Sequence, residues 1–235
     1  NNSINMTNKD YAFNSDELKK KYNLKKCALL NDWEAIAYSY DYVSNDIEYI
    51  KKGASFNKTK LFLGPGTGLG ASISINDIVL PTEIGNTFHS YLSLQKNYEF
   101  ESQKTLVLED LISGSAISNM YEIKTNHKIS SEEVLKKSRQ DDPQAKIIIN
   151  GFIKSLAETL SELAMTFMPG DGIFLAGNLI RNIYDDINKE NFNEIFLSNR
   201  KNVHKEMLDM ITIGVIMKER TPLYGNLKLY QIINK

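Results

Sequence analysis

A glycine-rich segment between two apolar runs has a composition suited to holding an anion. It spans residues 61–75, contains Thr67, and carries a glycine at every second position, namely Gly64, Gly66, Gly68 and Gly70. Glycine permits a positive φ and lets the backbone approach a ligand closely, so successive amide N–H groups can converge on phosphate oxygens. The hydroxyl of Thr67 adds one more donor. We therefore predict a phosphate-binding loop.

The residues that follow decide between kinds of phosphate loop. A dinucleotide-binding fingerprint, G-x-G-x-x-G opening a helix, needs a glycine at the sixth position, which here is Leu69. A Walker A loop needs a Gly-Lys-Ser/Thr ending, which this sequence lacks. Instead, apolar residues at 71, 73 and 75 alternate with polar ones, as in a strand. The pattern favours a phosphate-binding β-hairpin, with an ordinary hairpin that binds nothing as the alternative.

Two carboxylates are placed where a substrate hydroxyl could meet them. Asp32 follows the apolar run Cys27–Leu30, which we expect to be a buried strand, and ligands collect at strand ends in α/β sheets. Glu83 lies in the Pro/Gly loop 81–85, which can present a side chain to solvent. Phosphoryl transfer to a hydroxyl uses a carboxylate that accepts the proton. The structural alternative for Asp32 is an N-cap of a helix beginning near Trp33.

Helices and strands alternate around these residues. The clearest prediction is a long helix with Asp142 as its cap, Pro143 in its first turn, an apolar stripe, and a stop at Pro169-Gly170. Strands are expected at 27–30, on both sides of the glycine loop, and at 78–80, 173–177 and 210–216, and further helices at 14–22, 34–40, 105–111, 115–123, from 180, and at 223–233. This order predicts an α/β fold with mixed β-sheets.

Composition limits the function classes. The chain has 235 residues, of which 42% are hydrophobic, so it can bury a sizeable core. The net charge is -1, so the chain has no excess of positive charge with which to bind nucleic acid or an anionic membrane surface. Cys27 is the only cysteine, and the three histidines lack metal-ligand spacing, so neither an internal disulfide nor a zinc site is expected. No apolar run is long enough to span a membrane, and we expect a cytoplasmic protein.

Six short motifs resemble those of bacterial glucokinases in order and spacing. They are TNKDYAF (7–13), LNDWEA (30–35), GPGTGLG (64–70), LPTEIG (80–85), EDLISG (109–114) and FLAGN (174–178). The resemblance implies the actin and hexokinase superfamily, with two ribonuclease-H-like domains that close on sugar and nucleotide. The small domain would comprise residues 1–42 plus 222–235 and be incomplete at its N-terminus, and the large domain would comprise 43–221.

The resemblance also implies a role for each motif. The reaction would be ATP-dependent phosphorylation of glucose, or a similar hexose, at its 6-hydroxyl, the entry to glycolysis, with Mg2+ as cofactor and a homodimer as the assembly. Asp32 would be the catalytic base. The sugar would be bound by Asn31, Glu83, Asn86 and Glu109, and the nucleotide by Gly64, Gly66, Thr67, Gly68, Ala176 and Gly177.

At three positions this sequence departs from the family pattern, and each departure limits how far the family's residue roles can be assigned to it. Asn86 stands where the family has a sugar-binding histidine, which leaves the sugar preference open. Asn178 replaces the second glycine of the adenosine motif, and its side chain would either crowd the adenine or adopt a left-handed conformation. The sequence has no Asp-Gly-Gly-Thr turn, which in the family supplies the first phosphate loop. We therefore expect this chain alone to be weak or inactive, and a noncatalytic sugar-binding relative is the alternative.

Overall fold

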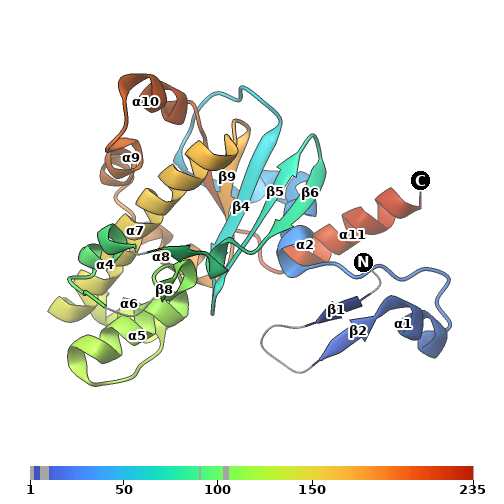
Figure 1. Cartoon of the computed structure of the whole chain (residues 1–235), viewed down its shortest axis with the longest axis horizontal. Helices are drawn as coiled ribbons and strands as arrows, with labels where there is room; N and C mark the ends of the chain where they lie inside the picture. The colour runs from blue at the N-terminus through green and yellow to red at the C-terminus, as the bar shows by residue number, and fades with distance from the viewer. Residues whose placement is uncertain (1–2, 6–10, 90, 103–105, 235) are drawn as a thin grey trace.

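A six-stranded mixed sheet forms the centre of the molecule (Figure 1). The computed structural model describes residues 3–5, 11–89, 91–102 and 106–234. The strand order is β3-β10-β9-β4-β5-β6, and β10, β9 and β4 are parallel while the other neighbours are antiparallel. The strands are β3 (Ile47–Lys51), β4 (Thr59–Pro65), β5 (Leu69–Ile75), β6 (Ile78–Thr82), β9 (Gly172–Leu175) and β10 (Ile213–Ile216). The predicted α/β class with mixed sheets is confirmed.

Both faces of the inner strands β4, β9 and β10 are covered, and apolar residues continue through these strands instead of alternating with polar ones. Leu61 and Leu63 of β4 belong to one buried cluster, and Phe62 between them belongs to another. Successive side chains of a strand point to opposite faces, so the two clusters lie on opposite sides of the sheet. One is built mainly from the long helix α7 and the other from α2 and its neighbours.

Helix α7 (Pro143–Phe167) confirms the longest predicted element. The side chain of Asp142 caps it by accepting a hydrogen bond from the Ala145 amide at 2.8 Å, and Pro143 occupies its first turn. Figure 1 shows α7 running across the sheet. The other helices in this part of the chain are α4 (Leu92–Asn97), α5 (Gly114–Thr125), α6 (Ser131–Arg139), α8 (Asn178–Ile183), α9 (Lys189–Leu197) and α10 (Asn202–Asp209).

The opposite face carries helix α2 (Asp32–Tyr38), the short α3 (Tyr40–Val43) and the last helix, α11 (Thr221–Ile233). Helix α11 crosses α2 closely at Gly225, where a Cβ atom would stand 1.7 Å from the carbonyl oxygen of Ala35. Helix α1 (Ser15–Tyr22) begins after Asn14, as predicted. Its neighbours β1 (Ser3–Asn5) and β2 (Ala12–Asn14) form a separate antiparallel pair.

Two predicted elements are wrong. Cys27–Leu30 is irregular, and within the described residues no strand lies beside it to complete its backbone hydrogen bonds. The helix predicted at 105–111 is replaced, over its described residues, by strand β8 (Leu106–Val107) and the 3-10 turn η3 (Leu108–Asp110). Strand β8 pairs with β7 (Phe88–His89), so a tertiary contact overrides the local helical pattern.

Three further 3-10 turns are η1 (Ser44–Asp46), η2 (Ile84–Asn86) and η4 (Tyr184–Asp186). None of the helices in the described residues is both long and apolar enough to cross a membrane. Helix α2 lies within the sequence predicted for the small domain, and it packs on β5 and β6 of the central sheet. The division into residues 1–42 plus 222–235 and residues 43–221 stays a prediction.

Candidate functional site

The glycine-rich segment forms the predicted hairpin, in which β4 ends at Pro65 and β5 begins at Leu69. Gly64 and Gly70 are direct partners across the two strands, and the tip is closed by a 2.8 Å hydrogen bond from the amide of Gly66 to the carbonyl of Gly68. None of these glycines adopts a positive φ, so that part of the expectation is wrong. Instead, the missing side chains of these glycines allow other protein groups to pack closely against the hairpin backbone.

The side chain of Trp33 occupies the space above the paired glycines. A Cβ at Gly64 would stand 2.0 Å from Cη2 of the indole, and a Cβ at Gly70 would stand 1.6 Å from Nε1. The buried hydroxyl of Ser72 on β5 donates to the carbonyl of Trp33 at 2.7 Å. The first turn of α2 is therefore fixed to the hairpin from two directions.

This contact places Asn31 and Asp32 beside the hairpin. Asn31, not Asp32, is the N-cap of α2, which corrects the structural alternative considered for Asp32. The side-chain oxygen of Asn31 accepts from the Trp33 amide at 2.8 Å, and Glu34 accepts from the Asn31 amide at 3.0 Å, a complete capping box. Asp32 is the first helical residue, and its carboxylate is exposed to solvent, where a substrate hydroxyl can reach it.

Glu109 approaches the same hairpin from another side. Its Oε2 accepts a hydrogen bond from the amide of Leu69 at 3.2 Å. A Cβ at Gly68 would stand only 2.5 Å from that oxygen, so the absent side chain at Gly68 makes room for the carboxylate. Turn η3 therefore delivers Glu109 to the hairpin.

The loop that contains Glu83 and Asn86 also contacts Leu69. The side-chain amide of Asn86 donates to Oε2 of Glu83 at 3.3 Å, and both residues are exposed. Between them, Gly85 packs so tightly that its Cβ would stand 2.3 Å from the carbonyl oxygen of Leu69. The structure thus brings three predicted sugar-binding residues, Glu83, Asn86 and Glu109, into two loops that contact one residue of the hairpin.

Ala176 and Gly177 follow strand β9 and lie against the start of the hairpin. The amide of Ala176 donates to the carbonyl of Leu63 at 3.0 Å. Gly177 has φ of 117°, a conformation that side chains disfavour, so glycine is required there. Asn178 is the first residue of α8 and is not left-handed, which excludes one of the two interpretations of this position.

Two glycines of the site are less crowded than the others. The nearest atom to a Cβ built on Gly66 is 4.0 Å away, and for Gly177 it is the carbonyl oxygen of Pro65 at 3.8 Å. Gly66 and Thr67 are exposed, and the amides of Thr67 and Gly68 donate to no acceptor in the described residues. The glycines thus differ: at positions 64, 68 and 70 another side chain fills the space of a Cβ, whereas at positions 66 and 177 no atom comes closer to it than 3.8 Å.

The hairpin tip is held by the first turn of α5. The amide of Gly114 donates to the carbonyl of Gly66 at 2.7 Å, and the hydroxyl of Ser115 donates to the carbonyl of Thr67 at 2.6 Å. The sequence does not predict the hydrogen bonds of Ser115 and Ser72 to this region, nor the packing of Trp33 on Gly64 and Gly70. The six-residue spacing of Gly64 and Gly70 was the available signal, since these positions face each other in a hairpin with a three-residue connection.

No group of three or more His, Cys, Asp or Glu side chains that could hold a metal ion occurs in the described residues. The arrangement can present carboxylates to hydroxyl groups on one side of the hairpin tip and free backbone amides to an anion at the tip itself. Both features suit transfer of a phosphoryl group to a sugar.

Comparison with known proteins agrees with this chemistry. A family model described as Glucokinase matches residues 1–231. A glucokinase of Helicobacter pylori (strain J99) is 28% identical over 247 residues, which cover 94% of this chain and 73% of the relative. A glucokinase of Campylobacter jejuni subsp. doylei is 29% identical over 201 residues, 77% of this chain and 60% of the relative.

Solved structures share the fold. A glucokinase from an Antarctic psychrotroph superposes with a TM-score of 0.80 and 21% identity, over 99% of this chain and 77% of that one. A glucokinase from Balamuthia mandrillaris, solved in complex with glucose, superposes with a TM-score of 0.78 and 18% identity, over 98% and 74%.

Proposed function

The chain belongs to the glucokinase family, hexokinase-type phosphotransferases, and we propose that it binds glucose or a similar hexose beside the β4–β5 hairpin and phosphorylates its 6-hydroxyl with ATP. The observation that carries this proposal is the convergence of α2, the loop after β6, turn η3 and the end of β9 on residues 64–70. Segments far apart in the sequence meet there with the groups that the reaction needs.

Asp32 is the proposed catalytic base. Its carboxylate is exposed at the start of a helix whose next residue, Trp33, is seated on Gly64 and Gly70. A base must be held at hydrogen-bond distance from the proton that it accepts, and this seat fixes the backbone from which the carboxylate extends. Asp32 would accept the proton of the sugar hydroxyl as the oxygen attacks phosphorus.

Glu83, Asn86, Glu109 and Asn31 are the proposed sugar-binding residues. Carboxylate oxygens accept hydrogen bonds from vicinal hydroxyls, and the amides of Asn86 and Asn31 can both donate and accept. Because Asn86 is already bonded to Glu83, the two side chains would act on the sugar as a pair.

Gly66, Thr67 and Gly177 are the proposed nucleotide contacts. The absence of close contacts above Gly66 and Gly177, and the free amides of Thr67 and Gly68, fit a phosphate chain that leads from the hairpin tip towards Ala176. ATP supplies the phosphoryl group, and Mg2+ neutralises charge on its phosphates while needing only one or two protein carboxylates. At Gly64, Gly68 and Gly70 the space of a side chain is filled by Trp33 or Glu109, which leaves their backbone as the part that can serve the nucleotide.

Formation of glucose 6-phosphate from glucose, ATP and Mg2+ is the direct test. Trp33 is the only tryptophan, so its emission gives a separate readout of sugar binding at the site. Turnover together with a saturable, glucose-specific change in emission supports the proposal. A saturable change without turnover would identify a sugar-binding protein instead, and the absence of both would contradict the assignment. The expected homodimer, cytoplasmic location and part in glycolysis stay predictions.

A further inference from the structure

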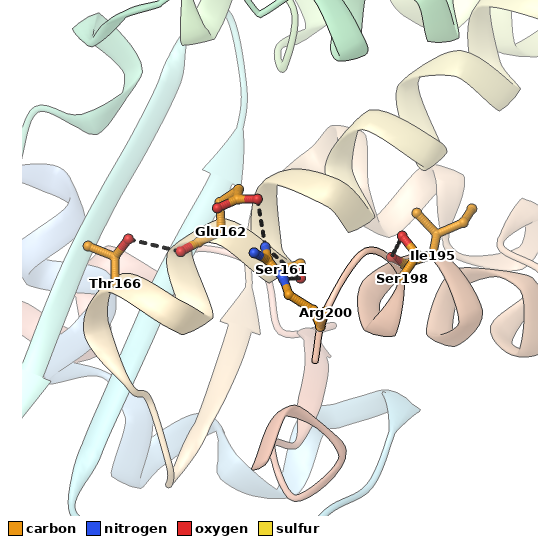
Figure 2. A network of polar contacts seen from close by, with 6 residues as sticks. All are labelled: Ser161, Glu162, Thr166, Ile195, Ser198 and Arg200. Atoms are coloured by element: carbon orange, nitrogen blue, oxygen red, sulfur yellow. Dashed lines mark hydrogen bonds and ion pairs between the residues drawn. The ribbon is translucent and has the colours of Figure 1, made fainter. Parts of the chain in front are cut away.

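The polar side chains beside the second half of α7 are bonded to one another. Figure 2 shows Arg200 donating to Oε1 of Glu162, at 2.6 Å, and to the hydroxyl of Ser161, at 3.2 Å. The hydroxyl of Ser198 donates to the carbonyl of Ile195 at 2.7 Å. A cavity of about 620 Å³ lies here, but these groups of its lining already have partners in the protein. The hairpin tip differs, because two of its backbone amides have no acceptor in the described residues.

The direction of these two amides is fixed by the carbonyls that share their peptide units. No peptide bond in the described residues is cis, and in a trans unit the C=O and N–H groups point to opposite sides. The carbonyl of Gly66 shares a unit with the amide of Thr67, and the carbonyl of Thr67 shares one with the amide of Gly68. Both carbonyls accept hydrogen bonds from the first turn of α5, so both N–H groups point away from that helix.

The two units are held by different kinds of donor. The carbonyl of Gly66 accepts from the backbone amide of Gly114 at 2.7 Å, a donor that does not depend on a side chain. The carbonyl of Thr67 accepts from the hydroxyl of Ser115 at 2.6 Å. The direction of the Gly68 amide therefore depends on the side chain at position 115.

The 67–68 peptide has less restraint than its neighbours. The 68–69 unit is bonded at both ends, since its carbonyl accepts from the amide of Gly66 and its N–H donates to Glu109. Rotation of the 67–68 unit changes φ of residue 68, and glycine tolerates values of either sign. Gly68 must also stay small to make room for Glu109. The freedom of this glycine is thus built into the loop, and the hydroxyl of Ser115 limits it.

We propose that Ser115 is a positioning residue for the nucleotide phosphates, acting through the 67–68 peptide. Its hydroxyl holds the carbonyl of Thr67 on the α5 side, so that the amide of Gly68 faces the place proposed for the phosphate chain. The inference rests on the proposed function, in which the amides of Thr67 and Gly68 are phosphate donors. Ser115 bonds the opposite side of the peptide from these donors, so it acts on the nucleotide only through the backbone.

Calorimetric titration of the whole chain with MgATP is the first test. Ser115→Ala should weaken binding about tenfold, because a backbone donor to a charged phosphate loses its fixed direction. Ser115→Thr keeps a hydroxyl and should bind MgATP as the wild type does. The matched control is Asn119→Ala, since Asn119 is exposed one turn later on α5 and its side chain makes no hydrogen bond among the described residues.

Two further measurements separate positioning from a structural role. Glucose affinity, read from Trp33 emission, should be unchanged in Ser115→Ala, because Glu109 contacts the next peptide unit. The Tm should also be unchanged, because Ser115 is exposed. A merely structural role would instead lower the Tm and weaken the binding of glucose and MgATP together, and that result would overturn the inference.

Amide resonances followed by NMR during the MgATP titration test the mechanism itself. In the wild type the amides of Thr67 and Gly68 should both shift. In Ser115→Ala the Thr67 amide should still shift, because Gly114 holds its peptide unit, and the Gly68 amide should not. The inference alone is overturned if Ser115→Ala binds MgATP as tightly as the wild type, or if both amides shift alike in the variant. If the wild type does not bind MgATP, the nucleotide part of the proposed function fails together with the inference.

Discussion

The indole of Trp33 lies against the backbone of Gly70, with Nε1 in the place that a Cβ at position 70 would occupy. The contact joins the residue next to the proposed base to the hairpin that carries the proposed phosphate contacts. Two parts of the proposed chemistry are therefore positioned by one packing interaction.

Gly70→Ala should destabilise the fold by about 1–3 kcal/mol, because the added methyl forces the indole or the strand to move. Gly66→Ala is the matched control, since its methyl would meet nothing closer than 4.0 Å. Urea unfolding of both variants measures the difference. Equal stabilities would show that the indole is not seated on Gly70.

Asp32→Asn should lower kcat for glucose phosphorylation by roughly 10²–10⁴, the usual contribution of a general base, and change glucose affinity little. The amide keeps the size of the side chain but cannot accept the proton. Steady-state kinetics and Trp33 emission give the two values. Asp185→Asn, an exposed carboxylate in turn η4, is the control, and a kcat for Asp32→Asn equal to that of the control would remove Asp32 from the mechanism.

Gly68→Ala should weaken glucose binding, because its methyl would stand 2.5 Å from Oε2 of Glu109 and displace the carboxylate from the Leu69 amide. The loss should resemble that of Glu109→Ala, and the double variant should lose little more than either single variant, since both changes act on one interaction. Glucose titrations of the three variants test this. Additive losses would show that Gly68 and Glu109 act separately.

Tyr40→Phe should remove part of the alkaline instability of the protein. Burial, with a smaller contribution from Asp171, raises the pKa of Tyr40 from 10.0 to about 12. Between these values the unfolded chain releases the phenolic proton and the folded chain retains it, so stability falls as pH rises through this window. Below pH 10 the contribution is fully present.

The phenylalanine variant keeps the ring that contacts Phe62 and Phe174 but has no such titration. Urea unfolding of both proteins at about pH 8 and about pH 11 should show a larger loss of stability for the wild type. Parallel losses would mean that Tyr40 ionises in the folded chain as it does in the unfolded one.

Local signals in the sequence predict much of the fold. The Asp142 cap, Pro143 and the apolar stripe define α7, and the alternation after Leu69 defines the hairpin. The strand expected at Cys27–Leu30 and the helix expected at 105–111 are wrong because their outcome depends on neighbouring strands, which an apolar run does not specify.

The sequence motifs identify residues that the fold brings together, but they do not show which of these residues pack against other protein groups. The motif places Gly64, Gly66, Gly68 and Gly70 together, yet only three-dimensional packing shows that Trp33 and Glu109 fill the space at three of them. Likewise, Asn31 and Asp32 are adjacent candidates for the N-cap, and the choice depends on where α2 begins on the hairpin.

The close crossing of α2 and α11 at Ala35 and Gly225 has a consequence for biosynthesis. The two helices are separated by most of the chain, so α2 leaves the ribosome long before the surface that covers it has been translated. The proposed base then stays on a helix packed from one side only until α11 emerges.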